Sequence, residues 1–233
     1  MRKIVKGILI LIMLVILVGA IVFGIFVYQG YEMYKTALAE SSMHERIEKI
    51  RSKSDYLSID LISENFKDAL IAIEDHRFES HGAVDFISIG RAVFRNIING
   101  SFNEGGSTIT QQLAKNTFFT QERKFTRKVA EIFAAVDLEN AYSKDEIIEM
   151  YMNTIYFGDG YYGINAASYG YFGKAPLELT FDEATLLAGI PNAPSIYSLS
   201  NNPDLARKRQ KYVIQSMIDY GFISQNELAE MQK

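Results

Sequence analysis

Cysteine is absent from the 233 residues of this chain, and proline and histidine are scarce, with four and three residues. Without cysteine the chain can form no disulfide, use no thiol in catalysis and build no thiolate metal site. The three histidines (His44, His76 and His81) leave little scope for a histidine-rich metal centre. What the sequence does contain is typical of a folded protein, because 48% of its residues are hydrophobic.

A long stretch without charge lies near the N-terminus. Residues 7–28 are uncharged throughout, and about 20 such residues cross the hydrocarbon core of a bilayer as a helix. The apolar part of a secretory signal is shorter, about 7–15 residues, so we expect an uncleaved transmembrane anchor at 7–28. Because Arg2, Lys3 and Lys6 precede it, the positive-inside rule places residues 1–6 in the cytoplasm and the body of the protein outside.

The net charge of the whole chain is −4, and the basic residues before the anchor make the remainder more acidic still. An acidic body disfavours nucleic acid as a partner and provides no general attraction to anionic lipid. An anionic substrate would therefore need a local cluster of positive charge.

Beyond the anchor, the sequence pattern divides the chain in two. Residues 29–55 are charged with weak apolar spacing, so we interpret them as a stalk that leads to a domain at 56–233. Apolar residues recur at helical spacing in that domain, with few strand signals. The sequence predicts a mainly α domain, with helices near 64–75, 84–99, 107–117, 125–142, 144–156, 181–190 and 204–221 and an irregular Gly- and Tyr-rich segment at 157–174.

A carboxylate pair, Glu74-Asp75, ends the first apolar helix of the domain. A carboxylate beside apolar side chains can have its pKa raised towards neutrality, which suits a general base. Acidic residues are also common on ordinary solvated surfaces, and the pair by itself leaves this alternative open. A metal site that combined Glu74 with His76, Glu79 and His81 would have no standard ligand spacing.

The segment GGSTITQQLAKN at 105–116 has two glycines that would let the backbone approach a ligand. The N-terminus of the helix after it offers free N–H groups to an anion, although the Gly-Lys-Ser/Thr of a P-loop is absent. A glycine turn with Ser107 as the N-cap is the alternative. The pair Gln111-Gln112, with Lys115 one turn later, is harder to explain by a turn alone.

Positive charge is concentrated just after this segment. Arg123, Arg127 and Glu131 would share one helix face, with Lys124 and Lys128 beside them. Such a face could hold a pyrophosphate through charge-assisted hydrogen bonds. A solvated stripe of ion pairs is the alternative.

Taken in order, these segments resemble the motifs of the peptidoglycan glycosyltransferases (glycosyltransferase family 51, the glycosyltransferase domain of class A penicillin-binding proteins). The motifs are EDxxFxxHG at 74–82, GGSTITQQLAKN at 105–116, RKxxE at 127–131, KDEIIEMYMN at 144–153 and GINAASYGYFGK at 163–174. The histidine–glycine part of the first motif is the one visible departure from the family pattern, and we interpret His81 as structural.

The resemblance implies a lysozyme-like, mainly helical domain, anchored in a bacterial cell membrane by one helix and lying outside it. It implies lipid II, a disaccharide-pentapeptide on undecaprenyl pyrophosphate, as the acceptor and a lipid-linked glycan strand as the donor. The 4-hydroxyl of N-acetylglucosamine would attack to form a β-1,4 bond with inversion. No organic cofactor is expected, and other cell-wall synthesis proteins could be partners.

The resemblance also implies roles for single residues. Glu74 would be the catalytic base, and Glu131 would orient cations or hold a divalent metal, Mg²⁺ or Mn²⁺. Pyrophosphate leaves readily, so its developing charge needs cations rather than a protonated acid. The cations would be Lys115, Arg123, Arg127 and Lys128, and the sugar and phosphate sites would be lined by Asp75, Phe78, Ser107, Gln111 and Gln112.

Helix 84–99 carries an apolar stripe, Phe86, Ile89, Val93 and Ile97. With a lipid-linked substrate, this stripe could dip into the outer leaflet. Packing in the core is the alternative.

Three other functions compete with this interpretation. A lysozyme-like hydrolase would share the fold and the glutamate but would need neither the cations nor the anchor, and a scaffold protein with a decayed site would not keep the motifs. The chain has no Ser-x-x-Lys or Lys-Thr-Gly motif, so we find no transpeptidase. Because it begins at Met and ends just after the domain, we expect a monofunctional enzyme, with a fragment of a two-domain penicillin-binding protein as the alternative.

Overall fold

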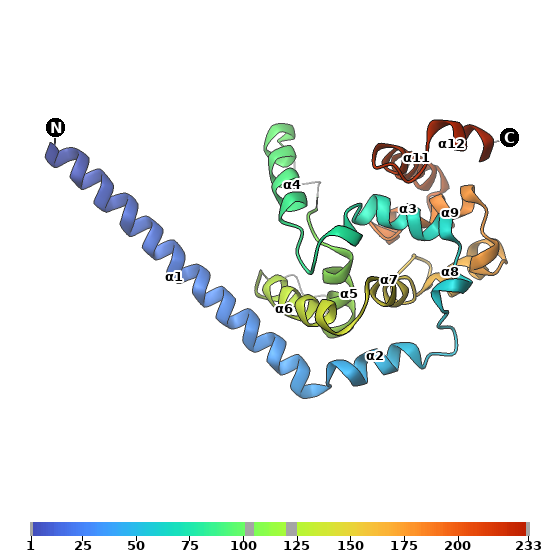
Figure 1. Ribbon diagram of the computed structural model, residues 1–233, viewed down its shortest axis with the longest axis horizontal. Coiled ribbons are helices and arrows are strands. Elements are labelled where there is room, and N and C mark those ends of the chain that lie inside the picture. Colours follow the sequence, from blue (N-terminus) through green and yellow to red (C-terminus); the bar gives the residue numbers. More distant parts are fainter. Residues whose placement is uncertain (1, 101–104, 120–124, 232–233) are drawn as a thin grey trace.

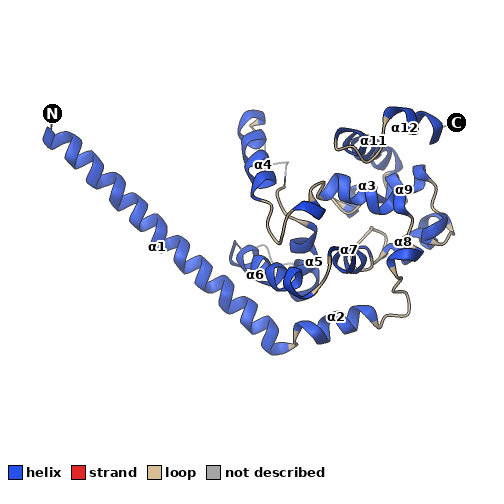
Figure 2. Ribbon diagram, viewed as in Figure 1, coloured by secondary structure: helices blue, strands red, loops and turns tan. Residues whose placement is uncertain are grey.

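The computed structural model describes residues 2–100, 105–119 and 125–231. Every regular element in these ranges is a helix, as Figure 2 shows, and one isolated β-bridge joins Tyr156 and Tyr162. The prediction of a mainly α protein is confirmed.

The N-terminal helix α1, Arg2–Glu40, is continuous for 39 residues and extends away from the body of the molecule (Figure 1). A window of 18 residues within it has a mean hydropathy of 3.4, and none of that window is buried. The core helix of a soluble protein would instead be mostly buried. By length and composition, α1 therefore fits the expected membrane span.

Residues 29–55 differ from the expected stalk, because they pack on the domain. The end of α1 and the following helix α2, Met43–Arg51, contribute Tyr34, Ile47 and Ile50 to the main hydrophobic core. Ser42 caps α2 in a capping box with Glu45. The sequence signal was weak because α2 presents only a narrow apolar face among charged residues.

Two groups of helices form the body. Helix α3 (Glu64–Glu74) packs against α9 (Phe181–Ala188) and α11 (Pro203–Asp219), and α5 (Ile109–Phe118) packs against α6 (Phe125–Ala141) and α7 (Lys144–Met152). In Figure 1, α5 and α7 lie between α6 and α3. Large side chains without exposed surface fill the core, among them Phe66, Leu70, Leu113, Leu138 and Tyr151. The short elements are η1 (Ile59–Leu61), η2 (Phe78–Ser80), η3 (Pro176–Glu178), α10 (Pro194–Tyr197) and α12 (Gln225–Met231).

Half of the segment expected to be irregular, 157–174, is helical. Helix α8 spans Ile164–Phe172, between Gly163 and Gly173, which have φ values of 82° and 68°. A Cβ at Gly163 would lie 2.7 Å from the carbonyl oxygen of Asn153, so only glycine fits there. The prediction was wrong because these two glycines bound a helix rather than prevent one.

Helix α4, Phe86–Asn99, projects from the body (Figure 1). Asp85 caps it by accepting hydrogen bonds from the N–H groups of Ile87 and Ser88. Ile89 of the predicted stripe is partly buried, but Phe86, Val93 and Ile97 are exposed, with 79% and 74% of the surface accessible for Phe86 and Ile97. Core packing is therefore not the reason for this apolar stripe.

Candidate active site

Glu74 is the last residue of α3, and its carboxylate is turned into the protein. Gln112 Nε2 of α5 donates to Glu74 Oε2 over 2.8 Å. The other oxygen, Oε1, is shielded from solvent and has no hydrogen-bond partner among the described residues. Burial raises the pKa of Glu74, and the Gln112 bond and the charges of Arg209 and Lys115 only partly oppose this effect. A shielded carboxylate with one free oxygen and a raised pKa suits proton removal.

Gln112 is oriented by Tyr151, a fully buried residue of α7. The Tyr151 hydroxyl donates to Gln112 Oε1 over 2.9 Å, which leaves the amide N–H groups to face Glu74. Burial raises the pKa of Tyr151 well above its ordinary value, so the hydroxyl remains a donor across the physiological range. No role was predicted for Tyr151, although it lies in the fourth motif, because helical spacing does not distinguish it from a core residue.

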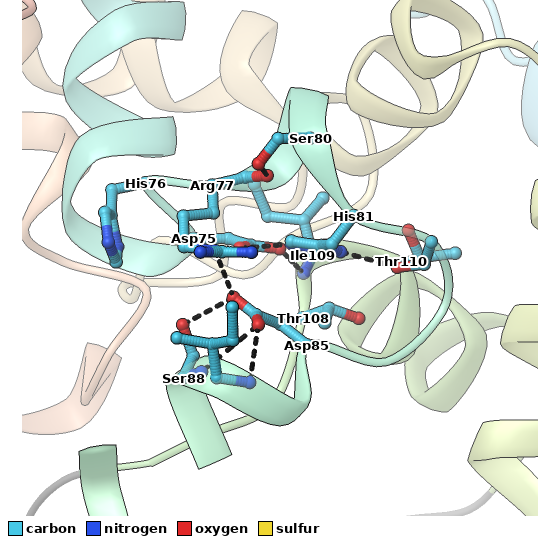
Figure 3. A network of polar contacts seen from close by, with 12 residues as sticks. Asp75, His76, Arg77, Ser80, His81, Asp85, Ser88, Thr108, Ile109 and Thr110 are labelled. Carbon is cyan, nitrogen blue, oxygen red and sulfur yellow. Dashed lines mark hydrogen bonds and ion pairs between the residues drawn. The ribbon is translucent and has the colours of Figure 1, made fainter. Parts of the chain in front are cut away.

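Asp75 is next to Glu74 in sequence but has a different environment, as Figure 3 shows. Asp75 Oδ1 lies 2.7 Å from His81 Nε2, and Oδ2 accepts the backbone N–H of Ile109 over 3.0 Å. Both oxygens are therefore occupied by protein groups, although we expected Asp75 to line a substrate site. Asp75 fastens the N-terminus of α5 to the end of α3, and this contact helps to place Gln112 beside Glu74.

His81 bridges two acceptors. Its Nε2 faces the Asp75 carboxylate, and its Nδ1 lies 2.5 Å from the carbonyl oxygen of Gly82. Burial alone would lower the pKa of His81, but the hydrogen bonds to Asp75 and Gly82 raise it above its ordinary value. Since only a protonated imidazole can donate from both nitrogens, this arrangement favours the charged ring.

Asp75, His81 and Asp85 bring candidate metal-ligand atoms within 4.8 Å of one another. The oxygens of Asp85 are already engaged, because Oδ1 caps α4 and Oδ2 lies 2.6 Å from Ser88 Oγ and 3.1 Å from Arg77 Nε (Figure 3). These contacts and those of Asp75 are protein–protein bonds that a metal would have to replace, so the cluster does not fit a divalent cation.

The polar residues at the start of the segment 105–116 have two different roles, one in the cap of α5 and one beside the cations. Thr108, not Ser107, caps α5, and it forms a capping box with Gln111. Gln111 is consequently buried and its side chain serves the cap, whereas we expected it to line the substrate site. Ser107 instead accepts a hydrogen bond from Lys128 Nζ over 2.6 Å. Ser107 therefore belongs to the cation cluster, while Thr108 and Gln111 belong to the helix cap.

Phe78 was also expected to line the substrate site. Its side chain has no exposed surface, and the Lys144 ammonium lies 4.4 Å from the centre of its ring. Phe78 is therefore part of the hydrophobic core. His76, from the same motif, stacks on Tyr220 with ring centroids 3.6 Å apart, away from any shared ligand arrangement with Glu74.

The cation cluster lies on α6. Glu131 is 2% exposed and contacts Arg127 Nε over 3.0 Å and Lys128 Nζ over 3.1 Å. Arg123, expected in this cluster, lies outside the described residues. Because Glu131 faces two cations, a metal ion bound to it would have to displace them, and the geometry favours orientation of the cations instead.

Lys115 joins the base to the cluster. It is half-buried on α5, and burial lowers its pKa while the charge of Glu131 opposes the shift. The charges of Arg127, Lys128 and Glu74 also act on the pKa of Lys115, so both parts of the site influence this ammonium electrostatically. Lys115 is positioned to approach an anion held by the α6 cations.

A cavity of about 990 Å³ opens beside Gln112, Lys115 and Tyr151. Lys49 of α2 and Lys53, just after that helix, form another part of its lining. Further along the lining, the rings of Tyr156 and Tyr162 lie with centroids 4.6 Å apart. These two lysines were not expected at the site, because residues 29–55 were interpreted as a stalk.

The sequence that forms this site matches a known family. The family model for transglycosylases covers residues 41–218. The chain belongs to the transglycosylase family. The fold is accordingly lysozyme-like, as expected from the resemblance, and the match includes α2, in agreement with its packing on the domain.

Several curated relatives resemble this transglycosylase. Penicillin-binding protein 1F of Bacillus subtilis is 48% identical over 176 residues, 76% of this chain and 25% of the relative. Penicillin-binding protein 1A/1B of the same organism is 38% identical over 241 residues, 100% of this chain and 26% of the relative. A Cupriavidus necator protein named as a transglycosylase is 42% identical over 177 residues, 76% of each chain. The chain therefore spans about a quarter of the length of the two penicillin-binding proteins.

Proposed function

We propose that this transglycosylase polymerises the glycan strands of the bacterial cell wall from lipid II. The observation that carries the proposal is the Glu74 carboxylate, whose Oε1 is shielded and without a hydrogen-bond partner among the described residues. A structural carboxylate would be expected to have both oxygens satisfied, as Asp75 has. The free oxygen is suited to accept a proton from a bound hydroxyl.

In the proposed reaction, the 4-hydroxyl of the acceptor N-acetylglucosamine attacks the anomeric carbon of the donor strand. The new bond joins O4 to that carbon, and the bond from the carbon to the pyrophosphate oxygen breaks with inversion. Glu74 takes the hydroxyl proton, and undecaprenyl pyrophosphate leaves with the bonding electron pair. The raised pKa of Glu74 makes the carboxylate a stronger base than an exposed glutamate.

The leaving group gains negative charge as the bond breaks. Arg127 and Lys128, held by Glu131, and Lys115 between them and Glu74 are the cations that would stabilise it. Arginine can bind a phosphate group through two parallel hydrogen bonds.

The cavity would hold the sugar chain. Its tyrosine pair, Tyr156 and Tyr162, presents rings against which sugars can pack, and Gln112 and Asn116 present amide groups to hydroxyls. Lys49 and Lys53 face the same cavity, where carboxylates of the peptide stems would find positive charge.

The topology of the protein would match a substrate confined to the membrane. With residues 1–6 in the cytoplasm and the span at 7–28, the active site lies outside the cell membrane, on the side where the lipid-linked strand grows. The exposed apolar side chains of α4, such as Phe86 and Ile97, would enter the outer leaflet.

The proposal is tested with the purified full chain in detergent or vesicles. Incubation with lipid II should give long glycan polymer and free undecaprenyl pyrophosphate, while finished peptidoglycan should stay uncleaved. Cleavage of finished glycan without polymer would establish the hydrolase alternative and refute the proposal. A Glu74→Gln variant serves as the matched control for contaminating polymerases.

A further inference from the structure

Gly30 marks a very close contact between α1 and α6. A Cβ at Gly30 would lie 2.5 Å from Val129 Cβ and 3.0 Å from the carbonyl oxygen of Thr126. A larger residue would therefore push the two helices apart. On the same helix, a Cβ at Gly19 or Gly24 would meet nothing within 4 Å, so those glycines provide matched controls.

The contact continues on both sides of Gly30. Ring centroids lie 5.2 Å apart in the pair Phe26–Phe125 and 5.3 Å apart in the pair Tyr31–Phe133. Further along, the Tyr34 hydroxyl donates to the Asp137 carboxylate. Because partners advance together along both helices, α1 and α6 run parallel over several turns, and Gly30 lies within this interface.

The other side of α6 carries the cation cluster. Residues two apart on a helix are separated by about 200° around its axis, so Arg127 and Glu131 lie roughly opposite Val129, which contacts Gly30. Lys128 reaches from α6 to Ser107 on the far side of this interface. Helix α6 is thus held between the anchor helix and the active site. In a close-packed interior, a displacement of its α1-facing side is transmitted to the other side.

We propose that residues 26–40 of α1 are a positioning element of the active site, and that Gly30 sets the distance at which α6 presents Arg127 and Lys128. The inference rests on the proposed function for the identity of the substrate. The chemistry recognised by these cations is a pyrophosphate group, which can be probed separately.

The experiment compares Gly30→Ala and Gly30→Leu with Gly24→Ala and Gly24→Leu in the full chain. Calorimetry with inorganic pyrophosphate measures the cation cluster, and polymerisation assays give KM and kcat for lipid II. For Gly30→Leu we expect both the pyrophosphate Kd and the KM to rise about 10- to 100-fold, because a shift near 1 Å has effects of this size. The Gly24 variants should stay within about 2-fold of wild type, since nothing surrounds that position.

Two readouts separate positioning from general damage. The acidic limb of the kcat/KM profile should keep its midpoint in Gly30→Ala, because Glu74 lies on α3, which packs against α9 and α11 rather than on α6. In the double variant Gly30→Ala with Val129→Gly, the methyl group added on α1 takes the space of the side chain removed from α6. This variant should restore pyrophosphate affinity. Val129→Gly alone is the control for weakening of the helix.

Gly30 variants that bind pyrophosphate and lipid II as well as their Gly24 counterparts would overturn the inference, and so would a double variant with no recovery over Gly30→Ala. If Gly30→Leu does not fold, as judged by thermal melting, the Gly30→Ala series decides. If wild type binds pyrophosphate but makes no polymer, the proposed function fails, while the inference is still judged by the pyrophosphate affinities.

Discussion

Glu74 and Glu131 are two shielded carboxylates of one site, and the protein treats them in opposite ways. Glu131 lies against Arg127 and Lys128, whereas Glu74 receives one neutral hydrogen bond from the described residues and keeps an oxygen without a partner among them. A carboxylate between cations is held in place by its ion pairs, but one without a charged contact remains ready to accept a proton. Burial alone therefore does not identify a base, because the partners decide its role.

The largest expected effect comes from Glu74→Gln. The amide keeps the shape and can still bond to Gln112 but cannot accept a proton, so we expect kcat to fall about 10³-fold, within the range for a lost general base. Thermal melting should show no loss of stability, because a buried charge with raised pKa is removed. A variant that polymerises lipid II at the wild-type rate would show that Glu74 is not the base.

Glu131→Gln, unlike Glu74→Gln, should lower the stability of the protein. It leaves Arg127 and Lys128 without their shielded counter-charge, so the free energy of unfolding should fall by about 2 kcal/mol, with Lys128 partly solvated. Urea unfolding measures this change, with Glu74→Gln as the control of equal size. Equal stability of the two variants would mean that pairing does not distinguish the two carboxylates.

The pH dependence sharpens the same contrast. The pKa of Glu74 is raised by burial, so the folded protein binds its proton more tightly than the unfolded chain, and this group lowers stability as pH rises from its ordinary pKa of 4.5 through the raised value. The acidic limb of kcat/KM should lie above that ordinary value. Gln112→Ala removes a bond that lowers the pKa, so the limb should move higher still. A limb at or below the ordinary value would contradict the assignment.

Tyr151→Phe should have the smallest effect. Loss of the hydroxyl leaves Gln112 Oε1 without its donor and frees the amide to turn, at a cost of about 1 kcal/mol. We expect kcat to fall several-fold and the fold to remain. Steady-state polymerisation measures this, and a fall as large as that of Glu74→Gln would make Tyr151 a reacting group instead of an orienting one.

Some of this site could be predicted from the sequence. The order of the motifs led to Glu74, Gln112 and Lys115. In the structure Glu74 comes from α3 and the other two residues come from α5, and Gln112 bonds to Glu74. The uncharged run at 7–28 was equally readable, because the length of an apolar helix is a local property.

Other features depend on contacts between distant residues and could not be predicted. The inward bonds of Asp75 require the N-terminus of α5 to meet the end of α3. The choice of Thr108 over Ser107 as the cap follows from the path of the backbone, since both side chains could serve. The place of α2 depends on the surface it covers, and its own sequence offers only a few apolar residues.

The segment that follows the anchor limits how such proteins can be recombined. It buries Ile47 and Ile50 in the core and places Lys49 and Lys53 along the cavity. An anchor and a catalytic domain joined by a loose tether could be exchanged between proteins at any point along the tether. Here a junction near residue 56 would separate a catalytic domain from part of its own core and cavity lining. A chimaera that keeps the enzyme intact should therefore be joined before residue 26, so that the end of α1, α2 and the domain stay together.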